Sequence, residues 1–201
     1  MMTATAFVAV SCSQGEKKPS EQSNSEPENT AVISGVKVDP AKSRVIWAGT
    51  MLGIYTHEGT VNFSQANLIM AEGKITGGNF TIDLNTIVPT DGNYNPEQGA
   101  TPEKLTGHLK SADFFDAENY PTASFNITSV DGNSLKGMMT IKGITHEEKV
   151  ENISMNRDGD KVSITGDMTI DRKKYEVKWD SPVKERVLSN DIKLKIELIG
   201  S

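Results

Sequence analysis

Residues 188–199 read LSNDIKLKIELI and carry the clearest folding signal of the chain. The even positions from 192 to 198 hold Ile or Leu, and the odd positions from 191 to 197 hold Asp, Lys, Lys and Glu. Alternation with a period of two residues is typical of a β-strand with one buried and one solvated face. The stretch therefore predicts a strand that packs on an apolar interior.

The same alternation recurs in six segments upstream. In each segment the apolar residues share one parity: Val45 and Trp47; Val61 and Phe63; Phe80, Ile82 and Leu84; Ala123, Phe125 and Ile127; Leu135, Met139 and Ile141; Val162, Ile164, Met168 and Ile170. The pairs Asp131-Gly132 and Asp158-Gly159 predict tight hairpin turns. Half-buried strands joined by tight turns indicate an all-β antiparallel sandwich or barrel.

Glycines interrupt several of these strand patterns. Gly49, Gly137 and Gly166 lie inside them, whereas Gly77 and Gly78 fit either a strand or a turn. Glycine within a strand permits bulges and sharp coiling, which a small closed barrel needs. The glycines therefore favour the barrel.

One segment, residues 101–110 (TPEKLTGHLK), predicts a short helix instead. Thr101 is a suitable N-cap, Pro102 suits the first helical position, and Leu105 and Leu109 lie four residues apart on one face. We expect this helix to pack across one end of the barrel. The preceding residues 89–100 predict a polar loop.

Composition excludes one broad class of function. The 201 residues carry a formal net charge of -6, and the basic residues are interleaved with acidic ones. A nucleic-acid-binding protein needs clustered Lys and Arg to contact phosphates. We therefore expect no nucleic-acid partner.

The N-terminal region predicts a membrane anchor. The apolar run 6–11 is followed by Cys12, the single cysteine, and residues 1–12 resemble a bacterial lipoprotein signal, although Ala9 stands where Leu is usual. Residues 13–34 are polar and contain no aromatic residue, which predicts a flexible tether. Residues 35–201 then form one domain. The alternative is an ordinary N-terminus with a free thiol.

Several motifs resemble those of the YceI-like family. The strongest is HLKSADFFD at residues 108–116, followed by Tyr120-Pro121 and Phe125. VDP at 38–40, MTIKGIT at 139–145 and IDR at 170–172 with Tyr175 match in order. The resemblance covers about residues 36–199. The sequence EVKWDSP after Tyr175 and the polar loop 89–100 depart from the family pattern, which we expect to reshape the mouth of a cavity.

The resemblance implies an eight-stranded antiparallel, lipocalin-like barrel with one short helix near an end. It also implies binding, transport or storage of a polyisoprenoid or similar amphiphilic lipid in the barrel interior. We expect the protein in the bacterial cell envelope, as a lipoprotein anchored through Cys12 on the periplasmic side or on the outer-membrane surface. The alternative is a structural or interaction module with a filled core, and a homodimer is compatible with either.

Nine residues are candidate ligand contacts. We expect the inward apolar residues to line a tunnel, and His108 to contact a headgroup or fix the helix. One ring of the DFFD motif should close the barrel end, either as a structural plug or in contact with ligand, and Phe114 is the candidate contact. Arg172 should hold an anionic headgroup or act as a surface charge. The full set is Trp47, Phe63, Phe80, His108, Phe114, Phe125, Met139, Met168 and Arg172.

Signals for catalysis are weak. The three histidines, His57, His108 and His146, lie on separate segments without metal-ligand spacing, and the chain contains no nucleophile elbow, P-loop or dinucleotide-binding motif. We therefore expect neither an enzyme nor a metal site, and no cofactor beyond a bound isoprenoid or fatty-acyl lipid.

Overall fold

The structure is a computed structural model that describes residues 36–201. The lipoprotein signal predicted to end at Cys12 and the tether 13–34 lie outside the described residues. Within the described part of the chain, no helix combines the length and the hydropathy that a membrane span requires.

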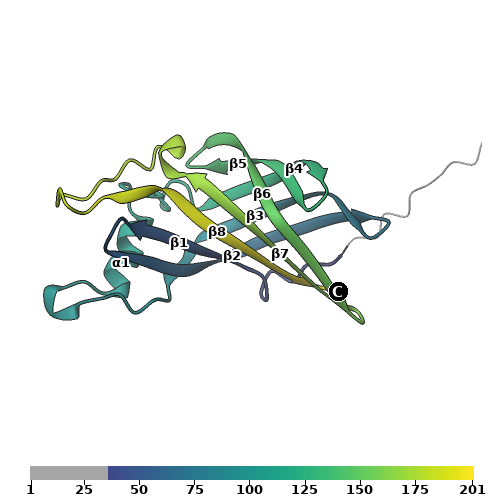
Figure 1. Cartoon of the computed structure of the whole chain (residues 1–201), viewed down its shortest axis with the longest axis horizontal. Coiled ribbons are helices and arrows are strands. Elements are labelled where there is room, and N and C mark those ends of the chain that lie inside the picture. Colours follow the sequence, from purple (N-terminus) through teal and green to yellow (C-terminus); the bar gives the residue numbers. More distant parts are fainter. Residues whose placement is uncertain (1–35) are drawn as a thin grey trace, which may run out of the picture. The chain divides into compact units, whose positions relative to one another are not determined.

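Eight antiparallel strands close into a barrel, as expected (Figure 1). Each strand pairs with the next along the chain, and the last pairs with the first, so that every strand has two neighbours. The strands are β1 (Arg44–Met51), β2 (Tyr55–Ala71), β3 (Lys74–Pro89), β4 (Thr122–Asp131), β5 (Ser134–Ile141), β6 (Ile144–Asp158), β7 (Lys161–Asp171) and β8 (Leu188–Gly200).

The predicted helix forms as α1 (Pro102–Lys110). The Thr101 hydroxyl accepts a hydrogen bond from the Lys104 amide, and Pro102 occupies the start of the helix, as the sequence indicated. Two short 3-10 helices, η1 (Pro96–Gln98) and η2 (Arg172–Tyr175), lie in the long connections. Figure 1 shows α1 at the end of the barrel opposite the C-terminus.

The interior contains the residues that the alternation predicted. Val45, Phe63, Phe125 and Ile164 are all buried, and Phe80 pairs with Phe125 across β3 and β4. In β8, Ile192 and Leu198 are buried, whereas Asn190 is exposed despite its even position. One apolar core therefore fills much of the barrel.

The hairpin turns lie one residue later than predicted. Asp131 and Asp158 each end a strand, and the two-residue loops that follow begin with Gly132 and Gly159, both in the left-handed region at φ 57° and 58°. Positive φ at this position is the reason that glycine occupies it.

Gly77 and Gly78 lie within β3, opposite Ile69 and Leu68 of β2, where the register of the two strands shifts nearby. Reading them as turn residues is therefore wrong. The chain turns earlier, at residues 72–73, so β3 is longer than the alternation suggested.

β6 showed no clear alternation in the sequence. The reason is an inward-facing acid: Glu148 is buried at 8% exposure and accepts a hydrogen bond of 2.9 Å from the Tyr175 hydroxyl of η2. Burial, together with this carboxylate, raises the pKa of Tyr175. The Tyr175 hydroxyl thus satisfies the buried Glu148 carboxylate, which interrupts the apolar alternation of β6.

The N-terminal segment closes the end of the barrel opposite α1. Val36 bridges to Leu68, and Val38 bridges to Gly200. The buried Ser43 hydroxyl donates to the Asp39 carbonyl at 2.8 Å and accepts from the Ile199 amide at 3.0 Å. This end is therefore tied by main-chain pairing, and α1 marks the other end.

Candidate ligand-binding cavity

Two apolar cavities lie inside the barrel. The larger, of about 200 Å³, extends to the α1 end, and the smaller, of about 70 Å³, lies toward the other end. Val45, Ile82, Met139 and Leu194 line both cavities. The cavities therefore adjoin along the barrel and are separated by side chains rather than by backbone.

Met139 is the most adaptable of the separating residues. It is buried on β5, and its unbranched thioether side chain can change rotamer at low cost. Its side chain can therefore yield to a bound molecule more easily than Val45 or Ile82, which also line both cavities.

The helix and the DFFD motif form the end wall of the larger cavity. Leu105, His108 and Leu109 of α1 line it together with Phe114 and Phe115. The two phenylalanine rings meet edge to face at 5.0 Å between centroids, and Phe114 is buried. Both rings therefore lie in the end wall, as the sequence predicted for one of them.

Asp116 shapes the turn that presents these rings. It has φ 52°, its amide donates to the Ser111 carbonyl at 2.8 Å, and its carbonyl accepts from the Asn119 and Tyr120 amides. Asp and Asn tolerate this left-handed conformation better than other non-glycine residues. The motif thus combines a turn-forming acid with two apolar rings.

His108 is the principal polar group of the cavity wall. Its ring lies 5.6 Å from Phe114 and 4.9 Å from Trp179 between centroids. Its Nε2 atom is buried and has no hydrogen-bond partner among residues 36–201. Desolvation lowers the pKa of His108, against a smaller opposing effect of the Asp113 charge.

An unpaired buried polar atom is costly. Leaving such a group without a partner costs about 1–3 kcal/mol, and native proteins rarely accept that cost. A neutral imidazole can donate from one nitrogen and accept at the other. His108 is therefore able to hydrogen-bond a polar group of a molecule in the cavity.

A second polar group on the cavity wall is His57 of β2. Its Nδ1 atom lies 3.1 Å from both carboxylate oxygens of Asp91, and its ring stacks on Tyr94 at 5.0 Å and meets Tyr55 at 4.7 Å. Burial favours a higher pKa of Asp91, but hydrogen bonds from the Asn93 and Glu58 amides and from His57 outweigh it and lower this pKa.

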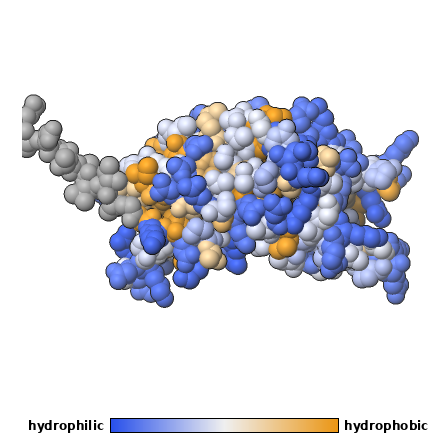
Figure 2. All heavy atoms as spheres, turned by 180° about the vertical axis from the view of Figure 1, so that it is seen from behind, coloured by the Kyte–Doolittle hydropathy of each residue, from blue (hydrophilic) through white to orange (hydrophobic). Residues whose placement is uncertain are grey.

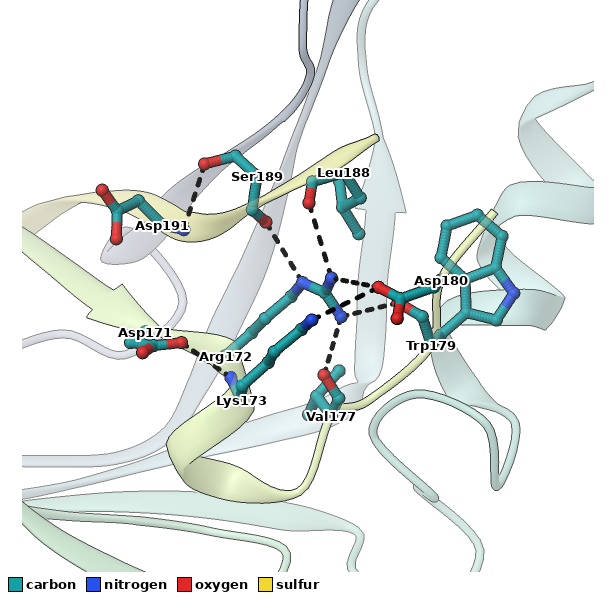
Figure 3. A network of polar contacts seen from close by, with 9 residues as sticks. All are labelled: Asp171, Arg172, Lys173, Val177, Trp179, Asp180, Leu188, Ser189 and Asp191. Carbon is teal, nitrogen blue, oxygen red and sulfur yellow. Dashed lines mark hydrogen bonds and ion pairs between the residues drawn. The ribbon is translucent and has the colours of Figure 1, made fainter. Parts of the chain in front are cut away.

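Arg172 holds the connection between η2 and β8 (Figure 3). Its guanidinium donates to the carbonyls of Val177 at 2.8 Å, Trp179 at 2.7 Å and Ser189 at 3.1 Å. A further bond of 3.1 Å reaches the Asp180 carboxylate. At 2% exposure Arg172 is buried, so the alternative of a surface charge is wrong.

The structure places eight of the nine predicted contact residues on the cavity walls. Trp47, His108 and Phe114 line the larger cavity, Met139 lines both, and the smaller cavity is lined by Phe63, Phe80, Phe125 and Met168. Arg172 lines neither cavity, and its three nitrogens already donate to protein groups. Contact of any of the nine residues with a ligand stays a prediction.

The sequence reasoning did not select Tyr55, His57 or Trp179, all of which line the larger cavity. Tyr55 and His57 share the odd parity of Val61 and Phe63, so extending that alternation upstream would have found them. Trp179 lies in the irregular segment EVKWDSP, which has no periodicity. Its position depends on distant residues: Arg172 donates a hydrogen bond to its carbonyl, and its ring packs on His108.

Among residues 36–201, no group of three or more His, Cys, Asp or Glu side chains could hold a metal ion. The walls of both cavities also lack Lys, Arg, Asp and Glu within this described part of the chain. Most of the polarity of the walls comes from two histidines, one tyrosine, two tryptophans and one threonine. These residues are His57, His108, Tyr55, Trp47, Trp179 and Thr165.

Fold and cavities together define a closed eight-stranded barrel with an apolar interior, an architecture that can hold one small ligand. The chain belongs to the YceI-like domain family, whose model matches residues 36–199. A UPF0312 protein of Staphylococcus aureus (strain bovine RF122 / ET3-1) is 31% identical over 137 residues, which cover 63% of this chain and 75% of that protein.

Solved structures share the fold. Burkholderia cenocepacia BcnA superposes with a TM-score of 0.65 at 24% identity, over 82% of this chain and 100% of that chain. A polyisoprenoid binding domain from Saccharophagus degradans, implicated in plant cell wall breakdown, superposes with a TM-score of 0.51 at 11% identity, over 83% of this chain and 97% of that chain.

Proposed function

We propose that this protein binds a polyisoprenoid or similar amphiphilic lipid inside its barrel and carries or stores it in the cell envelope. The observation that carries the proposal is the pair of adjoining apolar cavities, at whose wide end the buried Nε2 atom of His108 has no partner among the described residues. The similarity in fold to a domain described as polyisoprenoid-binding supports it.

The cavity sizes indicate how such a ligand would fit. An apolar cavity of about 150 Å³ stays dry and admits benzene. The larger cavity, at about 200 Å³, is therefore sufficient for a ring-sized or branched group. The smaller one would take the tail once Met139 moves, because this residue lines both.

The absence of charged groups on the described cavity walls favours a ligand with a neutral headgroup. A buried diphosphate without a cationic partner would cost far more than a buried hydroxyl or carbonyl. His108, whose pKa is lowered, can hydrogen-bond a neutral oxygen without carrying a charge. We therefore assign the α1 end to the headgroup and the opposite end to the apolar tail.

Native mass spectrometry of the full chain tests this function. With Cys12→Ser to remove acylation, the protein is incubated with geranylgeraniol, with an isoprenoid quinone or with geranylgeranyl diphosphate. We expect a one-to-one complex with the neutral lipids and weaker binding of the diphosphate. A protein that stays free of all three lipids would support the filled-core interaction module instead.

A pair of neighbouring substitutions supplies the control. Phe125→Glu places a charge in the smaller cavity, whereas Asn126→Glu places it on the exposed outer face of the same strand. Phe125→Glu should abolish binding and Asn126→Glu should retain it. Retained binding by a folded Phe125→Glu variant would contradict an interior site.

The anchor is part of the same proposal. A lipid-modified Cys12 followed by a polar tether would keep the barrel near a membrane that contains its ligand. The mass of the protein isolated from a bacterial envelope tests this: cleavage before Cys12 with added acyl chains is expected. An unmodified N-terminus at Met1 would contradict the anchor and leave the barrel function untouched.

A further inference from the structure

The α1 end of the barrel carries an exposed apolar patch. The most exposed large apolar side chains of residues 36–201 are Val187 at 54%, Leu52 at 52% and Ile54 at 50%, and Val183 is exposed at 42%. We call these four residues the rim patch. On the face that Figure 2 shows, hydrophobic residues lie in groups among hydrophilic ones, the densest of them toward the left of the view, away from the α1 end.

Main-chain bonds bring the patch together. The Leu52 amide in the β1–β2 turn donates to the Val187 carbonyl at 2.8 Å, although the two residues are far apart in the chain. The Arg186 amide donates to the Val183 carbonyl at 2.9 Å, which folds that segment into a turn. Main-chain hydrogen bonds thus hold the β1–β2 turn and the segment 183–187, and the exposed side chains of both are available to contact another surface.

The patch is continuous with the larger cavity. Met51 directly precedes Leu52, Tyr55 directly follows Ile54, and Leu188 directly follows Val187, and all three flanking residues line that cavity. Residues of the rim patch are therefore direct sequence neighbours of residues in the cavity wall. A bilayer in contact with the rim patch would lie close to the wall of the larger cavity.

The charge of the same region is opposite to that of the whole chain. Residues 172–187 contain six basic and three acidic residues, a formal net charge of +3, whereas the chain carries -6. Lys184 and Arg186 lie between Val183 and Val187, are exposed, and form no ion pair with any residue in the range 36–201. Glu185 is the one acidic residue between them.

Apolar side chains flanked by cations suit a bilayer surface. The apolar groups enter the boundary of the acyl chains, and each Lys or Arg near the surface is attracted to anionic lipids. A stable protein partner would require a contact of about 1,000 Å² or more, which four aliphatic side chains do not supply. The observations therefore favour a lipid surface over a protein.

We propose that the rim patch docks the barrel on a bilayer that contains anionic lipids, so that the lipid ligand passes between the bilayer and the larger cavity without crossing water. The passage of ligand rests on the function proposed above. Docking itself does not, because it depends only on the exposed side chains and their charge.

Vesicle flotation tests docking directly. The full chain with Cys12→Ser is mixed with vesicles of phosphatidylcholine, with or without phosphatidylglycerol. We expect flotation with the anionic vesicles and a decrease with added salt. Leu52→Asp with Val187→Asp should lower partitioning by about tenfold or more, and Lys184→Glu with Arg186→Glu should remove the preference for anionic lipid.

Two matched variants lie away from the patch. Met155→Asp changes an apolar residue that is 41% exposed, and Arg157→Glu changes an exposed cation, both on β6. These variants should float as the parent chain does. The proposal would be overturned if the control variants lost as much flotation as the patch variants. It would also be overturned if the parent chain did not float, and that result would indicate a protein partner.

Adding lipid to the protein from solution distinguishes membrane docking from lipid binding in the barrel. Geranylgeraniol added from ethanol should bind the patch variants as well as the parent chain, whereas uptake from vesicles should slow by about tenfold, in proportion to the lost partitioning. If patch variants fold with an unchanged melting temperature yet take up lipid from vesicles at the parental rate, docking through this rim is wrong. If the parent chain floats but binds no lipid, the function alone fails.

Discussion

Arg172 donates a hydrogen bond of 2.7 Å to the carbonyl of Trp179, and the indole of Trp179 lies against His108 at 4.9 Å between ring centroids. A buried cation on η2 thus determines where an aromatic residue of an irregular segment meets the cavity wall. The same guanidinium bonds to Val177 and Ser189 on either side. One side chain therefore ties the two ends of the connection between η2 and β8 together.

Replacing Arg172 should loosen that connection. Arg172→Met keeps much of the side-chain length but removes every donor, so the carbonyls of Val177 and Trp179 lose their partner. We expect a loss of about 2–4 kcal/mol in the free energy of unfolding, measured by urea denaturation. Hydrogen exchange should also accelerate over residues 176–188. Arg157→Met, an exposed control on β6, should change stability by less than about 0.5 kcal/mol.

Stability should fall in mild acid because of His108. Desolvation lowers its pKa below the ordinary value of 6.5, so the unfolded chain takes up the proton at a higher pH than the folded chain. Folded stability is therefore full above about pH 6.5 and decreases as the pH falls below it. The effect of Asp91, whose lowered pKa starts from 3.8, appears only at more acid pH.

Urea unfolding at pH 7 and pH 5 measures this dependence. The parent chain should lose more stability between the two values than His108→Asn, which cannot take up a proton. Parallel losses in the two proteins would show that His108 does not titrate as its buried position requires.

Gly137 should not tolerate a side chain. A Cβ atom at this position would lie 2.4 Å from the Phe125 ring and 2.5 Å from the Asn126 carbonyl oxygen. Gly137→Ala should therefore cost about 1–3 kcal/mol by overpacking. Gly107→Ala is the matched control, because it lies in α1 with no atom within 4 Å of its Cβ, and it should stabilise by up to about 1 kcal/mol. Equal effects at both positions would contradict the packing account.

Met139→Ala should join the two cavities. Removing this buried side chain should destabilise the ligand-free protein by about 2–5 kcal/mol and enlarge the space available to a lipid. We expect a larger rise in melting temperature on adding geranylgeraniol than in the parent chain. Met138→Ala, on the outer face of the same strand, should change neither quantity. A variant that loses stability but gains no ligand response would indicate that the cavities act separately.

Much of the fold was predictable because its signals are local. The alternation of β8 and of six other strands follows from which face each side chain occupies, and the bounds of α1 follow from Thr101 and Pro102. The same parity identified Trp47, Phe125 and Met139 as interior residues. β6 escaped detection because its buried Glu148 depends on Tyr175, which lies 27 residues later in the chain.

Local sequence signals were sufficient for seven of the eight strands, the short helix and the apolar interior, since each depends on neighbouring residues and a repeating geometry. Tertiary structure alone decided that Arg172 is buried, that Asp91 meets His57, and that Leu52 pairs with Val187. These contacts join irregular segments, whose backbone has no repeat that sequence could reveal. Their positions exist only once barrel closure brings distant connections to the same end.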